Sequence, residues 1–229
     1  MSPLQTTDID MPPLAGGAPR RLLVMLHGAG SSPGRIVTAA IAWQLKFRSA
    51  RAVLLAAPHI GTESVAPASR RYWVDPGEYP VRAASVRHEA DRLVERITAL
   101  QHEDELGCPQ TLVVGFSQGA SVALELAFAP TQVAAVVVGF AARLYRIPVD
   151  GDQVPAMIHL VHGRLDSVVP VVHGETALRR LGRVNAAATL DILEEAGHSV
   201  NQDQLNVATQ RVMQTVFAAR RARGAQRLH

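Results

Sequence analysis

Short apolar runs and amphipathic segments alternate along most of this 229-residue sequence. Several of the runs are continuously apolar, as expected for parallel strands that are covered on both faces. The expected strands are Leu22–Leu26, Ala52–Ala57, Thr111–Val114, Val133–Val138, Ala156–Val161 and Ala188–Leu193. The expected helices are Ile36–Phe47, Val81–Leu100, Gln118–Phe128, Val171–Leu181 and Gln204–Arg221. This alternation predicts an α/β fold with a mostly parallel central sheet and helices on both faces.

The length limits how many domains the chain can form. With 48% hydrophobic residues in 229, it can bury one sizeable core, and it is short for two domains or for a large lid. Residues 1–20 are rich in Pro and Gly and are predicted to be an irregular lead-in. Residues 21–222 are expected to form a single domain and residues 223–229 a basic tail. Within the domain, Pro58–Pro80 is predicted to be a long irregular binding loop.

Charge and cysteine usage exclude several classes of protein. The net charge is only +3 and the aromatic content is 4%, so the sequence lacks the basic stripe with interleaved aromatics that is typical of nucleic-acid binding. Cys108 is the only cysteine, which excludes an internal disulfide and a cysteine metal cluster. Residues 1–20 lack a secretory pattern, and no apolar run reaches the roughly 20 residues of a membrane span. We therefore expect a cytoplasmic protein with no nucleic-acid partner and no stable membrane insertion.

Ser117 is the candidate nucleophile. The run Gly115-Phe116-Ser117-Gln118-Gly119 matches the pattern Gly-x-Ser-x-Gly and lies between an expected strand and an expected helix. In this motif the serine occupies a sharp, strained turn, and small flanking residues let the strand and the helix approach closely. A glycine-rich turn with an idle serine is the alternative interpretation, and the strand-then-helix context argues against it.

The loop after the first expected strand is the candidate oxyanion loop. It reads His27-Gly28-Ala29-Gly30 and would supply a backbone N–H that acts together with the N–H following the nucleophile. By position, these donors are Ala29 N–H and Gln118 N–H, and neither needs its side chain. A phosphate-binding turn is the alternative, but Pro33 occupies the third glycine position of that pattern. His27 is expected to brace the loop rather than to react.

Asp166 and His198 are the candidate acid and base. In folds with this type of nucleophile the chain order is Ser, then Asp or Glu, then His. Asp166 follows the expected strand Ala156–Val161, at the sheet edge where open α/β sheets hold their active sites. Its alternative role is that of a plain turn residue. His198 follows the last expected strand and is predicted to take the proton of Ser117, with Asp166 orienting its ring.

These motifs together resemble the phospholipase/carboxylesterase family of α/β-hydrolases, which includes acyl-protein thioesterases and small bacterial esterases. The resemblance covers about residues 22–200. It rests on Leu26-His27-Gly28-Ala29-Gly30, Gly115-Phe116-Ser117-Gln118-Gly119-Ala120, His162-Gly163-Arg164-Leu165-Asp166 with Val169-Pro170, and Gly197-His198. It implies an α/β-hydrolase fold without a large lid domain, and a cofactor-free, metal-free esterase or thioesterase that is often a homodimer.

The resemblance also suggests where substrate lies. Tyr72-Trp73-Val74-Asp75 is similar to a Trp-Phe-Asp segment of the family beside the acyl-binding region, which makes Trp73 a candidate substrate contact. Phe140 follows the fourth expected strand, where the family usually has Ser-Gly, and it is a second candidate. The expected substrates are small-molecule acyl esters or thioesters of short to medium chain length. The alternatives are a peptidase or dienelactone-type hydrolase on the same scaffold, and a non-catalytic binding protein.

Overall fold

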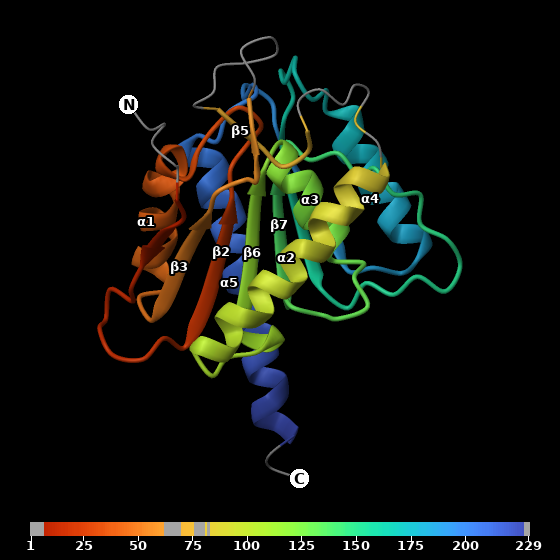
Figure 1. The fold of residues 1–229 in the computed structure, drawn as a ribbon. Helices are drawn as coiled ribbons and strands as arrows, with labels where there is room; N and C mark the ends of the chain where they lie inside the picture. Colours follow the sequence, from red (N-terminus) through yellow and green to blue (C-terminus); the bar gives the residue numbers. More distant parts are fainter. Residues whose placement is uncertain (1–6, 62–69, 76–80, 82, 227–229) are drawn as a thin grey trace, which may run out of the picture.

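The computed structural model describes residues 7–61, 70–75, 81 and 83–226, and from residue 219 onward only the backbone. Among these residues, seven strands form one sheet in the order β1-β3-β2-β6-β7-β8-β9 (Figure 1). All neighbouring strands pair in parallel except β1, which is antiparallel to β3. The strands are β1 (Ile9–Met11), β2 (Arg21–Leu26), β3 (Ala50–Leu55), β6 (Thr111–Phe116), β7 (Val136–Phe140), β8 (Met157–Gly163) and β9 (Ala188–Leu193). The predicted mostly parallel sheet is confirmed.

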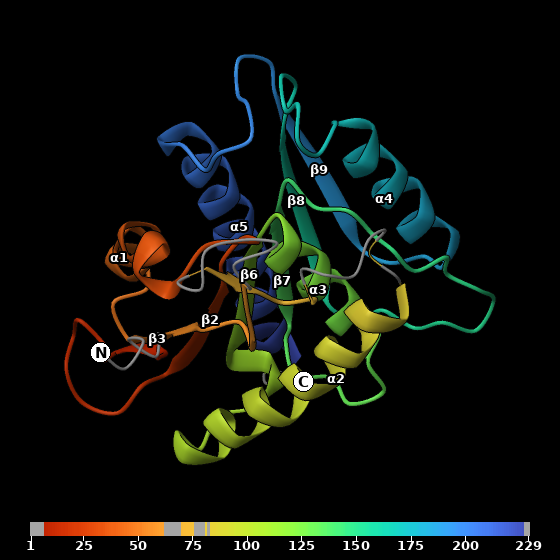
Figure 2. The same cartoon turned by 45° about the horizontal axis from the view of Figure 1, so that its top comes forward.

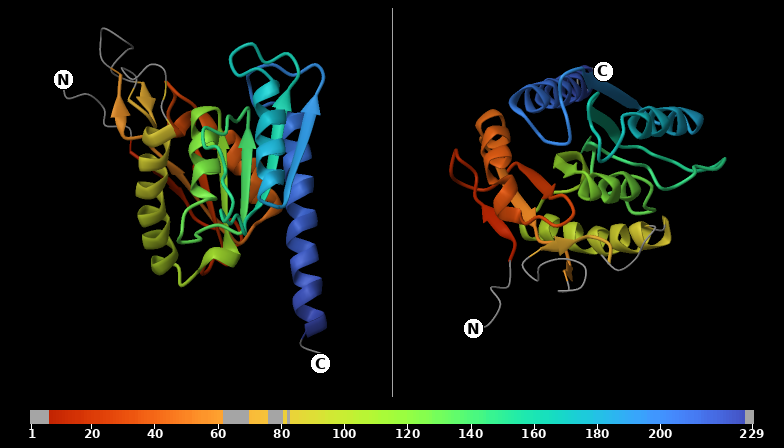
Figure 3. Two further views of the ribbon diagram at one scale, coloured as in Figure 1. Left: turned by 90° about the vertical axis from the view of Figure 1, so that its right-hand side faces the viewer. Right: turned by 90° about the horizontal axis from the view of Figure 1, so that it is seen from above.

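Helices cover both faces of the sheet, as Figure 3 shows from the side and from above. The helices are α1 (Val37–Lys46), α2 (Ala83–Glu103), α3 (Gln118–Leu126), α4 (Val172–Arg183) and α5 (Gln202–Gln226), with short 3-10 turns at Pro33–Ile36 and Cys108–Gln110. Alternate strand residues face opposite sides, so two hydrophobic cores form. Leu22, Val24 and Leu26 pack with α2, α3 and α4. Leu23 and Met25 pack with α1 and α5.

The N-terminal segment differs from the irregular lead-in predicted for residues 1–20. Ile9–Met11 forms β1, which pairs with β3 through Ile9↔Leu54 and Asp10↔Val53. Side chains from distant parts of the chain stabilise this edge. Asp10 pairs with the Arg51 guanidinium at 2.6 Å, and Gln44 Nε2 donates to the carbonyl of Pro12 at 3.0 Å. Three residues give no usable sequence period, which is why the strand was not predicted.

The segment predicted as an irregular loop at Pro58–Pro80 contains two short strands. These are β4 (His59–Ile60) and β5 (Arg71–Tyr72), paired antiparallel with His59 opposite Tyr72. Residues 62–69 and 76–80 of the same loop lie outside the described residues. At the other end of the chain, α5 continues to Gln226, so the predicted basic tail at 223–229 begins inside a helix. In the described part of the chain, none of the helices combines the length and apolarity needed to cross a bilayer.

Candidate active site

Ser117 lies at the junction of β6 and α3, at the carboxyl edge of the sheet that faces the viewer in Figure 2. Its backbone has φ 55° and ψ −115°, a left-handed conformation that a non-glycine residue adopts at a cost. Hydrogen bonds on both sides hold this geometry: Ser117 N–H donates to Phe140 O at 2.9 Å, and Ser121 N–H donates to Ser117 O at 3.0 Å. The sharp strand-to-helix turn expected from the motif is present.

The turn can be this tight because glycines flank it. A Cβ on Gly115 would lie 2.5 Å from the backbone of Ala120, and a Cβ on Gly119 would lie 2.5 Å from the carbonyl oxygen of His27. Both distances are shorter than any real side-chain contact. Larger residues at positions 115 and 119 would therefore push the helix away from the strands and displace Ser117.

Asp166 and His198 come together on adjacent loops after β8 and β9. His198 Nδ1 lies 2.8 Å from Asp166 Oδ2, and an ionised carboxylate only accepts, so the ring donates from Nδ1. The Asp166 side chain is fully buried, whereas that of His198 is 19% exposed. The imidazole packs against Phe116, the residue before Ser117, with ring centroids 4.9 Å apart. The arrangement brings the three candidate residues to the same edge of the sheet.

Two opposing effects act on the pKa of Asp166. Burial acts to raise it, but the hydrogen bond from His198 and the N–H groups of Val169 and Val168 outweigh burial and hold the pKa below its ordinary value. These N–H groups donate to Oδ1 at 2.7 and 2.9 Å, which leaves Oδ2 to His198. Asp166 is therefore a charged acceptor that fixes one tautomer of His198. The alternative interpretation, a plain turn residue, accounts for the Oδ1 contacts only.

His162 places a second imidazole beside Asp166, a neighbour that the sequence alone did not indicate. Its Nε2 lies 2.7 Å from the carbonyl oxygen of Val169 and 3.7 Å from Asp166 Oδ2. A carbonyl only accepts, so Nε2 carries a proton and its N–H is directed at the Val169 carbonyl. His162 thus stabilises the loop whose N–H groups hold Asp166. Its place in the His162-Gly163-Arg164-Leu165-Asp166 run was the available signal.

The candidate oxyanion loop lies against the Ser117 turn. A Cβ on Gly28 would lie 2.9 Å from the Phe116 ring and 3.5 Å from Ser117 Cβ, so a larger residue would have to displace that ring. Gly30 has φ +66°, and its N–H donates to Arg71 O of β5 at 2.8 Å. Ala29, between the two glycines, is exposed. The structure thus places the Ala29 segment beside Ser117, while its role as an N–H donor stays a prediction.

His27 braces this loop, as the sequence suggested. It is completely buried, its Nε2 accepts from Ala57 N–H at 3.2 Å, and its Nδ1 donates to Gly28 O at 2.8 Å. These two contacts define a neutral tautomer. Burial is the largest effect on His27 and lowers its pKa. The hydrogen bond to Gly28 acts to raise the pKa, the charge of Arg71 acts to lower it, and the pKa stays below its ordinary value. His27 therefore stays uncharged beneath the loop.

Gln118 has a structural role in its side chain that was not predicted from the sequence. Its Oε1 accepts from Trp73 N–H at 2.7 Å and from Val74 N–H at 3.4 Å. Trp73 itself is only 1% exposed, and its indole N–H donates to His27 O at 2.7 Å. In the structure Trp73 and Gln118 thus tie the β5 segment to the oxyanion loop. The contact of Trp73 with substrate stays a prediction.

A cavity of about 440 Å³ opens beside His198, between α1, α5 and the ends of β2, β6 and β7. Phe116, Phe140 and His198 line it from the sheet side, and Ser31 and Arg35 line it from the oxyanion side. Phe140 is 2% exposed, so it offers this cavity a small part of its ring. Phe140 therefore lines the same cavity as the candidate base, whereas Trp73 lines a separate pocket with His59 and Val74.

Comparisons with known proteins identify the family of the chain. The family model described as Phospholipase/Carboxylesterase matches residues 15–215. The chain is 28% identical to Esterase YpfH of Escherichia coli (strain K12) over 199 residues, which are 86% of this chain and 84% of the relative. The crystal structure of esterase PE8 is 28% identical, with a TM-score of 0.80, and covers 91% of this chain and 98% of its own.

A more distant solved structure supports the fold. The carboxylesterase of Bacillus cereus is 15% identical, with a TM-score of 0.73 over 91% of this chain and 94% of its own. The family model spans β2 to the middle of α5 and therefore includes Ser117, Asp166 and His198. The chain has the α/β-hydrolase fold, is a carboxylic ester hydrolase, and belongs to the phospholipase/carboxylesterase family.

Proposed function

We propose that this carboxylesterase-type hydrolase cleaves short to medium acyl esters or thioesters through Ser117, His198 and Asp166, with an acyl-enzyme intermediate. The observation that carries the proposal is the 2.8 Å contact between His198 Nδ1 and buried Asp166, on a ring that packs beside the strained Ser117 turn. With Nδ1 donating to Asp166, the neutral ring has Nε2 available as a base.

The proposed chemistry has two halves. In the first, Ser117 Oγ attacks the carbonyl carbon, His198 Nε2 takes the hydroxyl proton, and the proton is then passed to the departing alcohol or thiol. In the second, His198 takes a proton from water, the water oxygen attacks the acyl carbon, and the proton returns to Ser117 Oγ as the acid leaves. The N–H groups of Ala29 and Gln118 would stabilise the oxyanion in both halves.

The cavity beside His198 supports the proposed substrate size. Its volume of about 440 Å³ lies at the lower end of the roughly 300–1,000 Å³ typical of small-molecule sites. Met25, Ile36 and Leu205 give it apolar surface for an acyl chain or an alcohol group. We further propose a cytoplasmic location, which is compatible with the free thiol of Cys108, and a homodimer, which sedimentation can test.

Hydrolysis of p-nitrophenyl esters from acetate to palmitate tests this function. We expect the highest kcat/KM at short to medium chains, and a loss of roughly 10³-fold or more in Ser117→Ala because the nucleophile is removed. Ser49→Ala is the matched control, since Ser49 lies between α1 and β3, away from the carboxyl edge. Ester turnover by Ser117→Ala at the wild-type rate would show that the nucleophile is wrongly assigned. A preference for palmitate would refute the substrate range.

A further inference from the structure

The cavity beside His198 has an apolar floor and a polar rim. The floor consists of lining side chains that are apolar and buried: Met25, Leu26, Val114, Phe140 and Leu205. The rim consists of lining side chains that are polar and exposed: Arg35, Thr38 and Ser199. A molecule that is complementary to this cavity therefore has an apolar body and a polar end.

Arg35 gives the rim a positive charge. Among the described residues that line the cavity, Arg35 and His198 are the only ionisable ones, so none of them offers a carboxylate to the guanidinium. Within the described part of the chain the Arg35 side chain forms neither an ion pair nor a hydrogen bond, whereas Arg51 and Arg211 pair with carboxylates. The charge of Arg35 is thus available to an anionic group in the cavity.

The backbone fixes the position of Arg35 relative to the oxyanion loop. Arg35 lies in the 3-10 turn Pro33–Ile36, which directly follows that loop, and its N–H donates to Ser32 O at 3.1 Å. Pro33 is buried at the start of the turn, where its ring restricts φ. Ser31 pairs with Arg71 of β5 on the other side. The rim is therefore built on backbone that is tied to the reaction centre.

The cavity lies on the leaving-group side of that centre. His198 and the two residues that follow it line the cavity. In the proposed mechanism His198 passes its proton to the departing alcohol, so the alcohol lies next to this ring. Ala29 and Gln118, whose N–H groups would hold the carbonyl oxygen, are not among the lining residues. The alcohol part of a bound ester would therefore extend into the cavity, toward Arg35.

We propose that the cavity binds the alcohol part of the ester and that Arg35 selects alcohols that carry a carboxylate. A guanidinium pairs with a carboxylate through two parallel N–H bonds, and the apolar floor contacts the carbon skeleton between the hydroxyl oxygen and the acid. The inference rests on the proposed function and narrows its substrate class to esters formed on the hydroxyl group of hydroxy acids.

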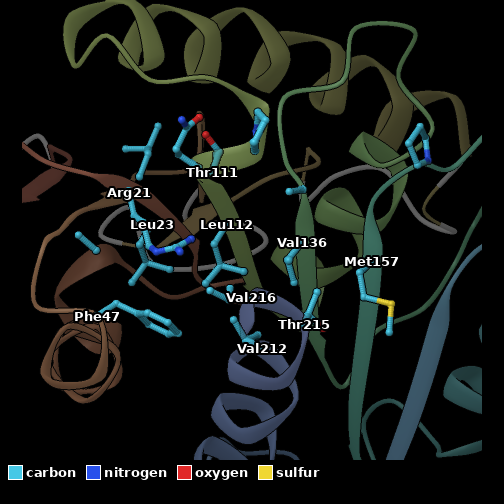
Figure 4. A pocket seen from close by; sticks show the side chains of 16 residues that line it. Arg21, Leu23, Phe47, Thr111, Leu112, Val136, Met157, Val212, Thr215 and Val216 are labelled. Atoms are coloured by element: carbon cyan, nitrogen blue, oxygen red, sulfur yellow. The ribbon is translucent and has the colours of Figure 1, made fainter. Parts of the chain in front are cut away.

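The other large pocket of the described chain does not take part in this selection. It has a volume of about 260 Å³ and lies at the opposite end of the sheet, around the first residues of β2, β6 and β8 (Figure 4). Strand β6 runs from Thr111, which lines that pocket, to Phe116, which precedes Ser117. At about 3.3 Å per residue this is a separation of about 17 Å. The relative rates of two esters therefore report on the cavity beside His198.

Two esters that differ in one charge test the selection. 4-Carboxyphenyl acetate and 4-carbamoylphenyl acetate share the acyl group and nearly the same shape, but only the first is an anion. We define the carboxylate ratio as kcat/KM of the first ester divided by that of the second. Comparison of this ratio between variants cancels the intrinsic reactivities of the esters. In wild type it should fall about 5-fold between about 0.02 M and about 1 M NaCl, because salt screens an exposed cation.

Variants at position 35 test the residue itself. Arg35→Gln should lower the carboxylate ratio about 5-fold at low salt and remove its salt dependence. Arg35→Glu should lower it about 20-fold, because like charges repel, and Arg35→Lys should keep more of it than Arg35→Gln does. Arg48→Gln is the matched control: Arg48 is exposed between α1 and β3, away from the carboxyl edge, and its loss changes the net charge equally. Melting curves verify that each variant is folded.

A second pair of esters tests which part of the substrate Arg35 contacts. The p-nitrophenyl monoester of adipic acid carries its charge on the acyl side, and p-nitrophenyl hexanoate is its neutral counterpart. Arg35→Gln should change the relative kcat/KM of these two by less than about 2-fold. A larger change here than with the two phenyl acetates would overturn the placement of the alcohol part in the cavity.

The same measurements separate failure of this inference from failure of the esterase assignment. If wild type hydrolyses neither phenyl acetate, the proposed function is wrong and this inference falls with it. If wild type hydrolyses both and Arg35→Gln keeps the wild-type carboxylate ratio, the esterase assignment stands and Arg35 does not select the substrate. An equal fall of the ratio in Arg48→Gln would assign the effect to the overall charge of the chain and would also overturn the proposal.

Discussion

At Asp166, burial and hydrogen bonding act on the same carboxylate in opposite directions. Burial alone would favour the neutral acid, yet three donors hold the pKa below its ordinary value. The consequence for His198 is a fixed tautomer, with the proton at Nδ1 and a lone pair at Nε2. The proposed reaction therefore depends on the negative charge of the Asp166 carboxylate, which an amide of the same shape would not supply.

Replacing Asp166 with Asn tests the need for that charge. The amide can still accept from Val168 and Val169, but its NH₂ group opposes Nδ1–H and favours the tautomer with Nε2 protonated. We expect kcat at neutral pH to fall by about 10³–10⁴-fold with a smaller change in KM. Asp191→Asn, which affects a carboxylate paired with Arg211, is the control and should keep kcat within about 2-fold. A kcat for Asp166→Asn above a tenth of wild type would contradict the role of Asp166.

At the scale of elements, the site depends on how closely the loops after β8 and β9 approach. A Cβ on Gly163 would lie 2.2 Å from Ala196 O, and Leu165 N–H donates to the same oxygen at 2.9 Å. These contacts hold Asp166, on the β8 loop, next to His198, on the β9 loop. The spacing between the two candidate residues is therefore set by backbone, not by the side chains that react.

Gly163→Ala should force these loops apart. We expect a fall in kcat/KM of about 100-fold or more and a lower melting temperature, since the methyl group meets backbone that cannot rotate away. Gly182→Ala in α4 is the matched control: its Cβ would meet nothing within 4 Å, and alanine favours a helix. Steady-state kinetics and thermal melts on both variants check this. Wild-type activity in Gly163→Ala would show that the close approach is not required.

His159 links β8 to β9 and α5, and it makes the fold sensitive to acid. Its ring nitrogens lie 2.8 Å from Thr189 Oγ1 and 3.0 Å from Thr215 Oγ1. Burial, aided by the charge of Arg211, lowers its pKa to about 4. A lowered pKa means that the unfolded chain binds the proton more readily, so stability is complete above about pH 6.5 and is lost as pH falls toward 4.

We therefore expect the free energy of unfolding to fall by about 2 kcal/mol between pH 7.5 and pH 5 because of His159 alone. His159→Gln should be less stable at pH 7.5 and should lose less between the two pH values. His88→Gln, which changes an exposed histidine on α2, should follow the wild-type pH dependence. Urea unfolding at both pH values measures the difference. An identical pH dependence in wild type and His159→Gln would refute this role.

Several elements follow from local sequence patterns, and others do not. The apolar runs at Leu22–Leu26 and Ala188–Leu193 became β2 and β9 with almost the predicted bounds. The short strands β1, β4 and β5 carry two or three residues each and exist through pairing with distant segments, which no local period encodes. For the same reason the Gln118 contact with Trp73 was not predicted, although both residues were singled out.

At the scale of the whole molecule, the edge of the sheet is stabilised by one buried side chain. Gln44 of α1 is completely buried, and the two N–H bonds of its Nε2 are shared among the carbonyls of Met11, Pro12 and Ala50, at 3.2, 3.0 and 2.9 Å. It therefore connects the N-terminal segment, α1 and β3, which are far apart in the sequence. None of these contacts lies at the carboxyl edge, where Ser117 is located. A change at Gln44 should therefore lower the stability of the fold without changing the rate of ester hydrolysis.

Gln44→Leu should lower the free energy of unfolding by about 1–3 kcal/mol, because the buried carbonyl of Ala50 and the part-buried carbonyls of Met11 and Pro12 lose a donor. The kcat of the folded enzyme should stay within about 2-fold of wild type. Gln214→Leu, an exposed position on α5, is the control and should change stability by less than about 0.5 kcal/mol. The comparison is made by urea unfolding. Equal stability of Gln44→Leu and wild type would show that the N-terminal edge is held by other contacts.

The role of Ser117 as nucleophile is tested by the mass of the intact chain after treatment with a fluorophosphonate, followed by mapping of the modified peptide. We expect one adduct per chain, on Ser117, with none in Ser117→Ala and much slower labelling in His198→Ala because the hydroxyl loses its base. A folded wild-type chain that stays unlabelled, or one that is labelled at another residue, would contradict it.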